Sequence, residues 1–249
     1  MGENDKTKAG PGADSRDSLA VAGLKIYIEG GAWQDVRGYL YPNAIRLIEY
    51  IDRCQDKMDV RGNLGEIGLF HGKLFIFLYL LARREENVVG VDLFVEDNWD
   101  SFHQNLAPYT YPGKDPVIVK SDSVELTADD FIDRAGGPYR MLSVDGGHLV
   151  DEALHDLRVA NAVLAEGGVL LLDDYFDPRW HGVSEATNRF YLGDDDIRIA
   201  PFLYTGNKTF FATTPHHRAY REAVEDAVDM TSGEIRTTSF HGEDLIVIT

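Results

Sequence analysis

One stretch of the chain, from Tyr139 to Trp180, constrains the fold more than any other. It reads as an apolar strand, the cluster Asp145-Gly146-Gly147-His148, an amphipathic helix, a Gly167-Gly168 turn, and a second apolar strand that ends at Asp173-Asp174. Two buried parallel strands joined by one helix form a βαβ unit. In an open α/β sheet, ligands bind beyond the carboxyl ends of the strands, and both polar clusters lie there. The stretch therefore predicts a doubly wound sheet with a binding site at this edge.

The three carboxylates of this stretch are expected to converge. Neighbouring strands lie roughly 5 Å apart, so Asp145 can approach Asp173 and Asp174 across the strand tips. Carboxylates at one point repel each other unless a cation lies between them. Their hard oxygen ligands suit Mg²⁺, with Mn²⁺ or Ca²⁺ as alternatives. The competing interpretation assigns the same residues to helix capping and solvated strand ends.

Length and charge narrow the class of protein. The chain of 249 residues is long enough for one large α/β domain, so we expect residues 19–249 to form a single domain. The formal net charge of −18 disfavours nucleic acid and anionic membranes as partners, because both would be repelled. A neutral or cationic small molecule is a better match for this charge.

The sequence also favours a cytoplasmic location. Its single cysteine, Cys54, excludes an internal disulfide and a cysteine-based zinc site, which suits a reducing compartment. There is neither a secretory leader nor an apolar run of about 20 residues, so we expect neither secretion nor a membrane span.

The N-terminal part is predicted to be accessory to the sheet. Residues 1–18 are rich in Gly, Lys, Asp and Glu and contain no aromatic residue, so we expect a disordered tail. Pro42 should open a helix. The apolar face of that helix is Ile45, Leu47, Ile48 and Ile51. The aromatic residues before and around it could line a site, although plain packing is the simpler interpretation; they are Trp33, Tyr39 and Tyr41.

A first strand ends near Glu66 and is followed by a glycine-spaced turn into an apolar helix. Gly68 and Gly72 let the backbone bend sharply and approach a ligand closely, and the helix N-terminus offers free N–H groups. The spacing differs from the dinucleotide fingerprint and lacks the lysine of the triphosphate loop, which disfavours dehydrogenases and NTPases. A purely structural turn is the alternative.

Acidic residues at the ends of the next two strands suit a ligand that contains adenosine. Asp92 ends the second strand, where an acidic residue of a nucleotide-binding βαβ unit accepts hydrogen bonds from the ribose hydroxyls. The third strand ends at Asp122-Ser123, where the aspartate could accept from an adenine amino group. Helix capping by either residue is an equally good interpretation.

The remaining chain completes the expected sheet. The segment 197–214 predicts an antiparallel hairpin that turns at Gly206-Asn207. Strands and helices alternate elsewhere, so we expect a Rossmann-like, mainly parallel, seven-stranded sheet with a late antiparallel pair and an N-terminal accessory helix. Apolar surface in the N-terminal segment and the hairpin is compatible with a homo-oligomer, but no pattern fixes a subunit number.

Considered together, these motifs resemble a known family, the class I S-adenosylmethionine-dependent O-methyltransferases. The resemblance is carried by the run from Glu66 to Gly72, Asp92, the Asp145 to His148 cluster, Gly167-Gly168, and Asp173-Asp174. Within that class the chain is most similar to the Mg²⁺-dependent enzymes that methylate sugar hydroxyls, such as the macrocin and mycinamicin O-methyltransferases and bacterial glycan methyltransferases. The similarity covers about residues 38–214.

The resemblance implies a role for each matched residue. The implied cofactor-binding residues are Glu66, Gly68 and Gly72 for the methionine end of S-adenosylmethionine, Asp92 for its ribose, and Asp122 and Ser123 for its adenine. Asp145, Asp173 and Asp174 would coordinate Mg²⁺ or Mn²⁺, with Asp145 also beside the cofactor. His148 would be the general base.

The expected reaction is Mg²⁺-dependent methyl transfer to a hydroxyl of a vicinal diol on a sugar, glycan or glycoside. Tyr175, Trp180 and His181 follow the metal pair and could form a wall against the sugar ring. A catechol-type O-methyltransferase is the first alternative, although phenols ionise more readily than sugars and need less help from His148. A non-catalytic module that binds an adenosine ligand is the second alternative.

Overall fold

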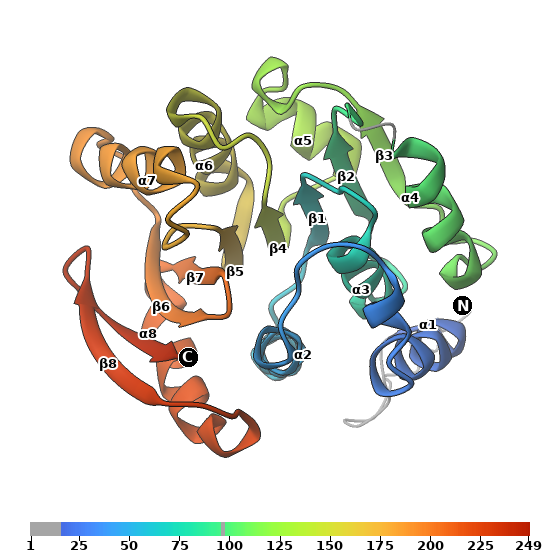
Figure 1. Ribbon diagram of the computed structural model, residues 1–249, viewed down its shortest axis with the longest axis horizontal. Coiled ribbons are helices and arrows are strands. Elements are labelled where there is room, and N and C mark those ends of the chain that lie inside the picture. The colour runs from blue at the N-terminus through green and yellow to red at the C-terminus, as the bar shows by residue number, and fades with distance from the viewer. Residues whose placement is uncertain (1–15, 96–97) are drawn as a thin grey trace, which may run out of the picture.

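The structure is a computed structural model that describes residues 16–95 and 98–249 (Figure 1). Most of the expected disordered tail, residues 1–18, therefore lies outside the described residues. At the end of that segment the chain already forms helix α1 (Ser18–Leu24). Asp17 caps its N-terminus, since the Asp17 side chain accepts a hydrogen bond from the Leu19 amide. Among the described residues, no helix combines the length and the hydropathy that a bilayer span requires.

All strands of the described residues belong to one twisted sheet. In chain order they are β1 (Asn63–Ile67), β2 (Val88–Asp92), β3 (Val117–Lys120), β4 (Tyr139–Val144), β5 (Leu164–Asp173), β6 (Ile199–Thr205), β7 (Lys208–Thr213), β8 (Ile235–Phe240) and β9 (Glu243–Ile248). Their spatial order is β3-β2-β1-β4-β5-β7-β6-β9-β8. The first five strands pair in parallel, and β7 is antiparallel to both β5 and β6. The Rossmann-like, mainly parallel sheet with a late antiparallel pair is confirmed.

The strand count differs from the expected seven, because the sheet has nine strands. The additional hairpin of β8 and β9 extends the sheet beyond β6. Most of β8 is solvent-exposed and polar, with the sequence IRTTSF. It therefore lacks the apolar alternation from which a strand is predicted.

Helices cover both faces of the sheet (Figure 1). One face packs against α1, α2 (Pro42–Lys57), α3 (Lys73–Leu81), α4 (Trp99–Leu106) and α8 (Thr214–Asp226). The other packs against α5 (Ala128–Ala135), α6 (Val150–Val163) and α7 (His181–Gly193). Strand β5 shows why both layers form, since Val169 and Leu171 belong to the first core and Leu170 and Leu172 to the second. An unbroken apolar strand of this kind must be buried on both sides.

The predicted accessory helix is confirmed as α2. Pro42 opens it, and all four apolar residues predicted for its inner face are buried in the first core. Short helical turns accompany the longer helices: η1 (Lys25–Glu29), η2 (Ala32–Asp35), η3 (Ala107–Tyr109), η4 (Ser123–Glu125) and η5 (Val228–Met230).

The strand order places the site. Beginning at β1, the chain proceeds outward through β2 to β3, then returns to the other side of β1 as β4 and β5. The loops that leave β1 and β4 therefore diverge toward opposite faces, which opens a crevice between them. The expected Gly167-Gly168 turn lies inside β5, where Gly167 has a positive φ of 78° and the pairing with β4 shifts register.

Candidate functional site

A cavity of about 570 Å³ lies in this crevice, beyond the carboxyl ends of β1, β2, β4 and β5. That volume is ordinary for a small-molecule site. Its lining joins the glycine turn after β1 to the strand-end acids of β2 and β4 and to the loop after β5. The predicted residues that line it are Gly68, Asp92, Asp122, Ser123, Asp145, His148, Asp174 and Trp180.

Gly68 is required by the close approach of two loops. Its φ is 87°, and a Cβ built on it would lie 1.8 Å from the backbone oxygen of Asp145. The Asp145 amide in turn donates to the Ile67 carbonyl at 2.8 Å. Any larger residue at this position would push the β1 and β4 loops apart, so Gly68 fixes how the two halves of the site meet.

Gly72 and Glu66 lie deeper than the cavity lining. Gly72, with a φ of 89°, precedes α3 and is not among the residues that line the cavity. Glu66 is 4% exposed at the end of β1, and burial raises the pKa of its carboxyl well above its ordinary value. No described side chain or amide donates a hydrogen bond to Glu66 Oε2, so this oxygen is available to a donor.

Asp92 holds the glycine turn in shape. Its Oδ2 accepts hydrogen bonds from the Leu69 amide at 2.7 Å and the Phe70 amide at 2.9 Å. Phe70 sits in the left-handed region with a φ of 49°, which a non-glycine residue adopts at a cost that these hydrogen bonds help to offset. The carboxylate also borders the cavity. Its position is thus compatible with the predicted ribose contact, while its visible role is to order the turn.

Asp122 and Ser123 combine both interpretations of their sequence. Asp122 precedes η4, and its Oδ1 accepts from the Val124 amide at 3.2 Å, as a helix cap does. Both residues also line the cavity at the end of β3.

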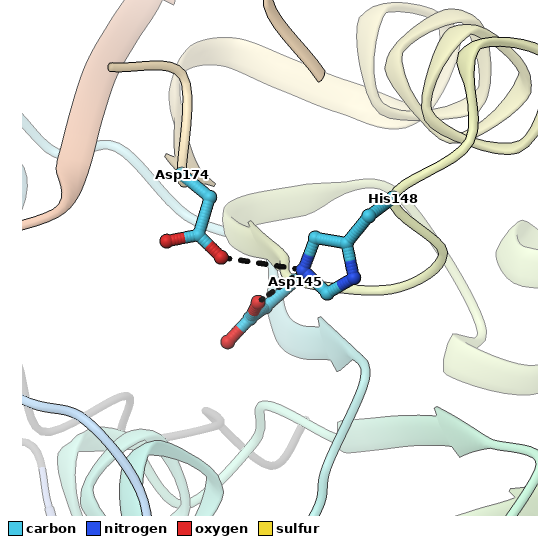
Figure 2. Close-up of side chains that lie close together, drawn as sticks. All are labelled: Asp145, His148 and Asp174. Carbon is cyan, nitrogen blue, oxygen red and sulfur yellow. Dashed lines mark hydrogen bonds and ion pairs between the residues drawn. The ribbon is translucent and has the colours of Figure 1, made fainter. Parts of the chain in front are cut away.

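Asp145, His148 and Asp174 converge at the tips of β4 and β5 (Figure 2). His148 Nε2 lies 3.2 Å from Asp174 Oδ2 and 3.9 Å from Asp145 Oδ1. One potential ligand atom from each residue lies within 4.8 Å of the others. Burial, together with the nearby charge of Asp173, raises the pKa of Asp145 well above its ordinary value. An ionised Asp145 is thus costly here without a cation, and the oxygen-rich donor set suits Mg²⁺ or Mn²⁺.

Asp174 adopts an unusual backbone conformation that aims its side chain into this cluster. Its φ is 62°, and its amide donates to the Asn207 carbonyl at 2.9 Å. Left-handed conformations at non-glycine residues concentrate at functional sites, where the surrounding structure compensates for them.

The structure places the Asp173 carboxyl beside Lys208 and Asn207, outside the group of converging ligand atoms. The Asp173 side chain is 2% exposed, Oδ1 pairs with Lys208, and Oδ2 accepts from Asn207 Nδ2 at 2.7 Å. The Asp173 carboxyl also interacts with that of Asp145. Asp173 belongs neither to the cluster of converging ligand atoms nor to the cavity lining.

Of the three residues predicted to face a sugar, only Trp180 lines the cavity. Its indole stacks on the His148 imidazole, with ring centroids 4.1 Å apart and planes 20° from parallel. Tyr175 is buried among Phe176 and Phe240, and His181 is an exposed residue at the start of α7. The local reason is the turn between β5 and α7, which directs these neighbours to different sides.

Several lining residues have no clear sequence signal. Tyr39 and Tyr41, for which packing was the simpler interpretation, line the cavity together with Asp177, Arg179 and Asn207. Asn207 was predicted only as a turn residue. The antiparallel hairpin at Gly206-Asn207 is confirmed, and its pairing with β5 brings Asn207 to the site. The predicted hairpin was therefore the sequence signal that could have indicated Asn207 as a neighbour of Asp173.

A comparison with protein families identifies part of the chain. Residues 66–175 match the family model Methyltransf_24, described as a methyltransferase domain. The uncharacterized protein R132 of Acanthamoeba polyphaga mimivirus is 24% identical over 141 residues, which are 56% of this chain and 63% of that protein. The matched region therefore spans less than two thirds of that relative.

Solved structures show the same fold. The O-methyltransferase NovP has a TM-score of 0.57 at 16% identity, over 81% of this chain and 100% of that chain. The O-methyltransferase TomG from Streptomyces achromogenes, solved with S-adenosylmethionine, has a TM-score of 0.51 at 17% identity, over 80% and 90%. An O-methyltransferase from Bacillus cereus, solved with S-adenosylhomocysteine, has a TM-score of 0.52 at 16% identity, over 80% and 91%.

Proposed function

We propose that this chain is an S-adenosylmethionine-dependent O-methyltransferase that methylates a hydroxyl of a sugar with the help of a divalent cation; its fold and its matched methyltransferase domain support this proposal. The observation that carries the proposal is the convergence of Asp145, His148 and Asp174 beside a cavity bordered on its other side by the glycine turn.

The two halves of the cavity suit the two reactants. Gly68, Asp92, Asp122 and Ser123 border the half that we assign to the cofactor. Asp174 and Trp180 border the half that we assign to the acceptor. Transfer between them requires the acceptor oxygen, the methyl carbon and the sulfur of the cofactor to lie in line. A rigid site at the strand ends provides such positioning.

Each residue of the cluster has a distinct part in this proposal. Asp145 and Asp174 would hold the cation, which when bound would orient the acceptor hydroxyl and make it more acidic. His148 Nε2 would accept the hydroxyl proton as the oxygen attacks the methyl group and the carbon–sulfur bond breaks. Trp180 keeps the imidazole plane fixed by stacking on it.

The acceptor half favours a sugar over a flat aromatic ring. Tyr39, Tyr41 and Trp180 offer aromatic faces, while Arg179, Asp177 and Asn207 add hydrogen-bonding groups on the same rim. Mixed aromatic and polar walls match the C–H faces and the hydroxyls of a saccharide. A sugar hydroxyl also needs a general base more than a phenol does, which is consistent with a histidine at the cation cluster.

The test is transfer of labelled methyl from S-adenosylmethionine to a panel of saccharides and catechols, in Mg²⁺ and again in EDTA. We expect a sugar to be labelled only in Mg²⁺. Labelling of catechols alone would assign the chain to the catechol-type alternative. Labelling that persists in EDTA would remove the cation from the mechanism.

A His148→Ala variant separates a base from a ligand in the same assay. As a base, His148 contributes about 10²–10⁴ to the rate, so the variant should lose transfer and still bind Mn²⁺. Loss of Mn²⁺ binding together with activity would instead make His148 a ligand. Near-normal turnover would exclude both roles.

A further inference from the structure

Lys208 is a buried lysine that lies beside the carboxyls at the ends of β4 and β5. It begins β7, is 1% exposed, and stands directly across from Asp173 in the antiparallel pairing of β5 and β7. Its ammonium pairs with Asp173 Oδ1 and also interacts electrostatically with Asp145 and Glu66. A fully buried lysine is rare unless it is paired, so its place among carboxylates calls for an explanation.

The hairpin that carries Lys208 takes up both oxygens of Asp173. Oδ1 contacts the ammonium, and Oδ2 accepts from Asn207 Nδ2 at 2.7 Å. Asp174, the next residue, joins Asp145 and His148 at the cavity, whereas Asp173 interacts with Asp145 from the buried side. Two consecutive aspartates therefore have different environments, one dry and paired and the other open to the cavity.

We infer that Lys208 holds Asp173 out of the coordination sphere, so that Asp145 and Asp174 are the only aspartates of the β4 and β5 ends that bind the divalent cation. The fixed positive charge of Lys208 beside the site lowers the affinity for that cation. The inference rests on the proposed function, because it concerns the cation of that site. It reverses the role that the sequence suggested for Asp173, which becomes a positioning residue for Lys208.

The charges explain the direction of the expected effects. A lysine a few ångströms from a bound divalent cation repels it, and the repulsion is strong where water is excluded. Removing the ammonium also leaves the buried Asp173 carboxylate without its cationic partner, and a bound divalent cation could then neutralise it. Removing both members of the pair leaves neither the repulsion nor the extra carboxylate.

The experiment measures Mn²⁺ binding by electron paramagnetic resonance, which requires neither acceptor nor turnover. Wild type is compared with Lys208→Met, with the pair Asp173→Asn plus Lys208→Met, and with Asp145→Asn. Lys120→Met is the control for net charge, since Lys120 is an exposed residue on β3. Thermal unfolding and binding of S-adenosylhomocysteine confirm that each variant is folded.

We expect Lys208→Met to bind Mn²⁺ more tightly by on the order of tenfold, and Lys120→Met to bind as wild type does. The pair variant should remain within about threefold of wild type, whereas Asp145→Asn should lose at least about tenfold, because a ligand is removed. Because the pair variant leaves no unpaired buried charge, it keeps the test decisive if Lys208→Met does not fold.

Two results would overturn the inference. If the pair variant loses Mn²⁺ as Asp145→Asn does, Asp173 is a ligand. If Lys208→Met folds and binds no more tightly than wild type, the ammonium does not oppose the cation. Should wild type bind no Mn²⁺ while Lys208→Met does, repulsion by the ammonium is upheld, but coordination by the wild-type site and the cation-dependent function both fail. Binding in neither variant nor wild type would overturn the inference and the proposed function together.

Discussion

Asp156 lies directly beneath the loop that carries the site. It is fully buried on α6, and a Cβ built on Gly146 would come within 2.7 Å of its Oδ2. Burial raises the pKa of Asp156 to about 6, because the ionised carboxylate loses its hydration. In the unfolded chain the pKa of an aspartate is about 3.9. The stability that Asp156 contributes is therefore complete below the unfolded pKa and is lost as pH rises through the folded pKa.

An Asp156→Asn variant should remove this pH dependence. We expect the free energy of unfolding of the variant to gain on that of wild type between pH 4 and pH 7, by up to about 3 kcal/mol for a shift of two pKa units. Urea unfolding at several pH values measures the difference, in which other titrating groups cancel. Asp151→Asn, at an exposed position of the same helix, is the control. Parallel pH profiles of wild type and Asp156→Asn would contradict the buried, protonated state.

At the same scale, the sequence predicts which residues lie together at the sheet edge but not the directions of their side chains. Asp145, His148 and Asp174 could be brought together in advance, because the carboxyl ends of neighbouring parallel strands meet at one edge. The different surroundings of Asp173 and Asp174 could not be predicted. They depend on the positive φ of Asp174 and on a lysine that reaches Asp173 from a strand 35 residues later.

Among the elements, the segment 36–41 between η2 and α2 contributes Tyr39 and Tyr41 to the cavity lining. On one side Lys73 Nζ donates to the Gly38 carbonyl at 2.8 Å. On the other side Tyr41 packs against Gly206, where a Cβ would meet its ring at 2.7 Å. The segment thus ties the start of α3 to the β6–β7 hairpin. Between these anchors Tyr39 lines the cavity and is 70% exposed.

Tyr39 is accordingly expected to bind the acceptor and to leave the cofactor unaffected. Loss of one stacked ring costs about 1 kcal/mol, or roughly fivefold in affinity. Tyr39→Ala should raise the KM for the saccharide by about that factor without changing the affinity for S-adenosylhomocysteine, and Tyr39→Phe should restore it. Steady-state kinetics and calorimetry make the measurement, with Tyr50→Ala on α2 as the control. A change in the affinity for S-adenosylhomocysteine, with an unchanged KM for the saccharide, would place Tyr39 in the half of the cavity that we assign to the cofactor.

The elements that the sequence predicts are those with strong periodicity or turn chemistry. Helix α2 has Pro42 and a regular apolar face, and the β6–β7 hairpin has Gly206-Asn207 at its turn. Helix α1 begins inside the segment expected to be disordered. The sequence did not predict this start, because the capping residue, Asp17, follows a polar, glycine-rich segment. The polar strand β8 is held by its pairing with β9 rather than by burial.

At the scale of the whole molecule, the sheet edge opposite the cavity contains a buried ionic network. Arg140, near the start of β4, is completely buried and joins two distant elements. Its Nη1 lies 2.8 Å from Asp52 Oδ1 on α2, and its Nε lies 2.7 Å from Glu86 Oε1 before β2. The same strand delivers Asp145 at its other end, about 16 Å away at 3.3 Å per residue. One strand therefore links the anchored edge to the reactive edge.

This network should matter for stability and leave the chemistry of the cavity intact. Arg140→Met would take from Asp52 its nearest cationic partner and would leave Glu86 with Arg83 as its partner. Removing one partner of a buried ion pair typically costs about 3–5 kcal/mol. Urea unfolding should show that loss, while the remaining folded protein binds S-adenosylhomocysteine with unchanged affinity. Arg158→Met is the matched control, because its pair with Asp194 is solvent-exposed and should contribute less than about 1 kcal/mol. Equal losses in the two variants would show that burial does not set the strength of the network.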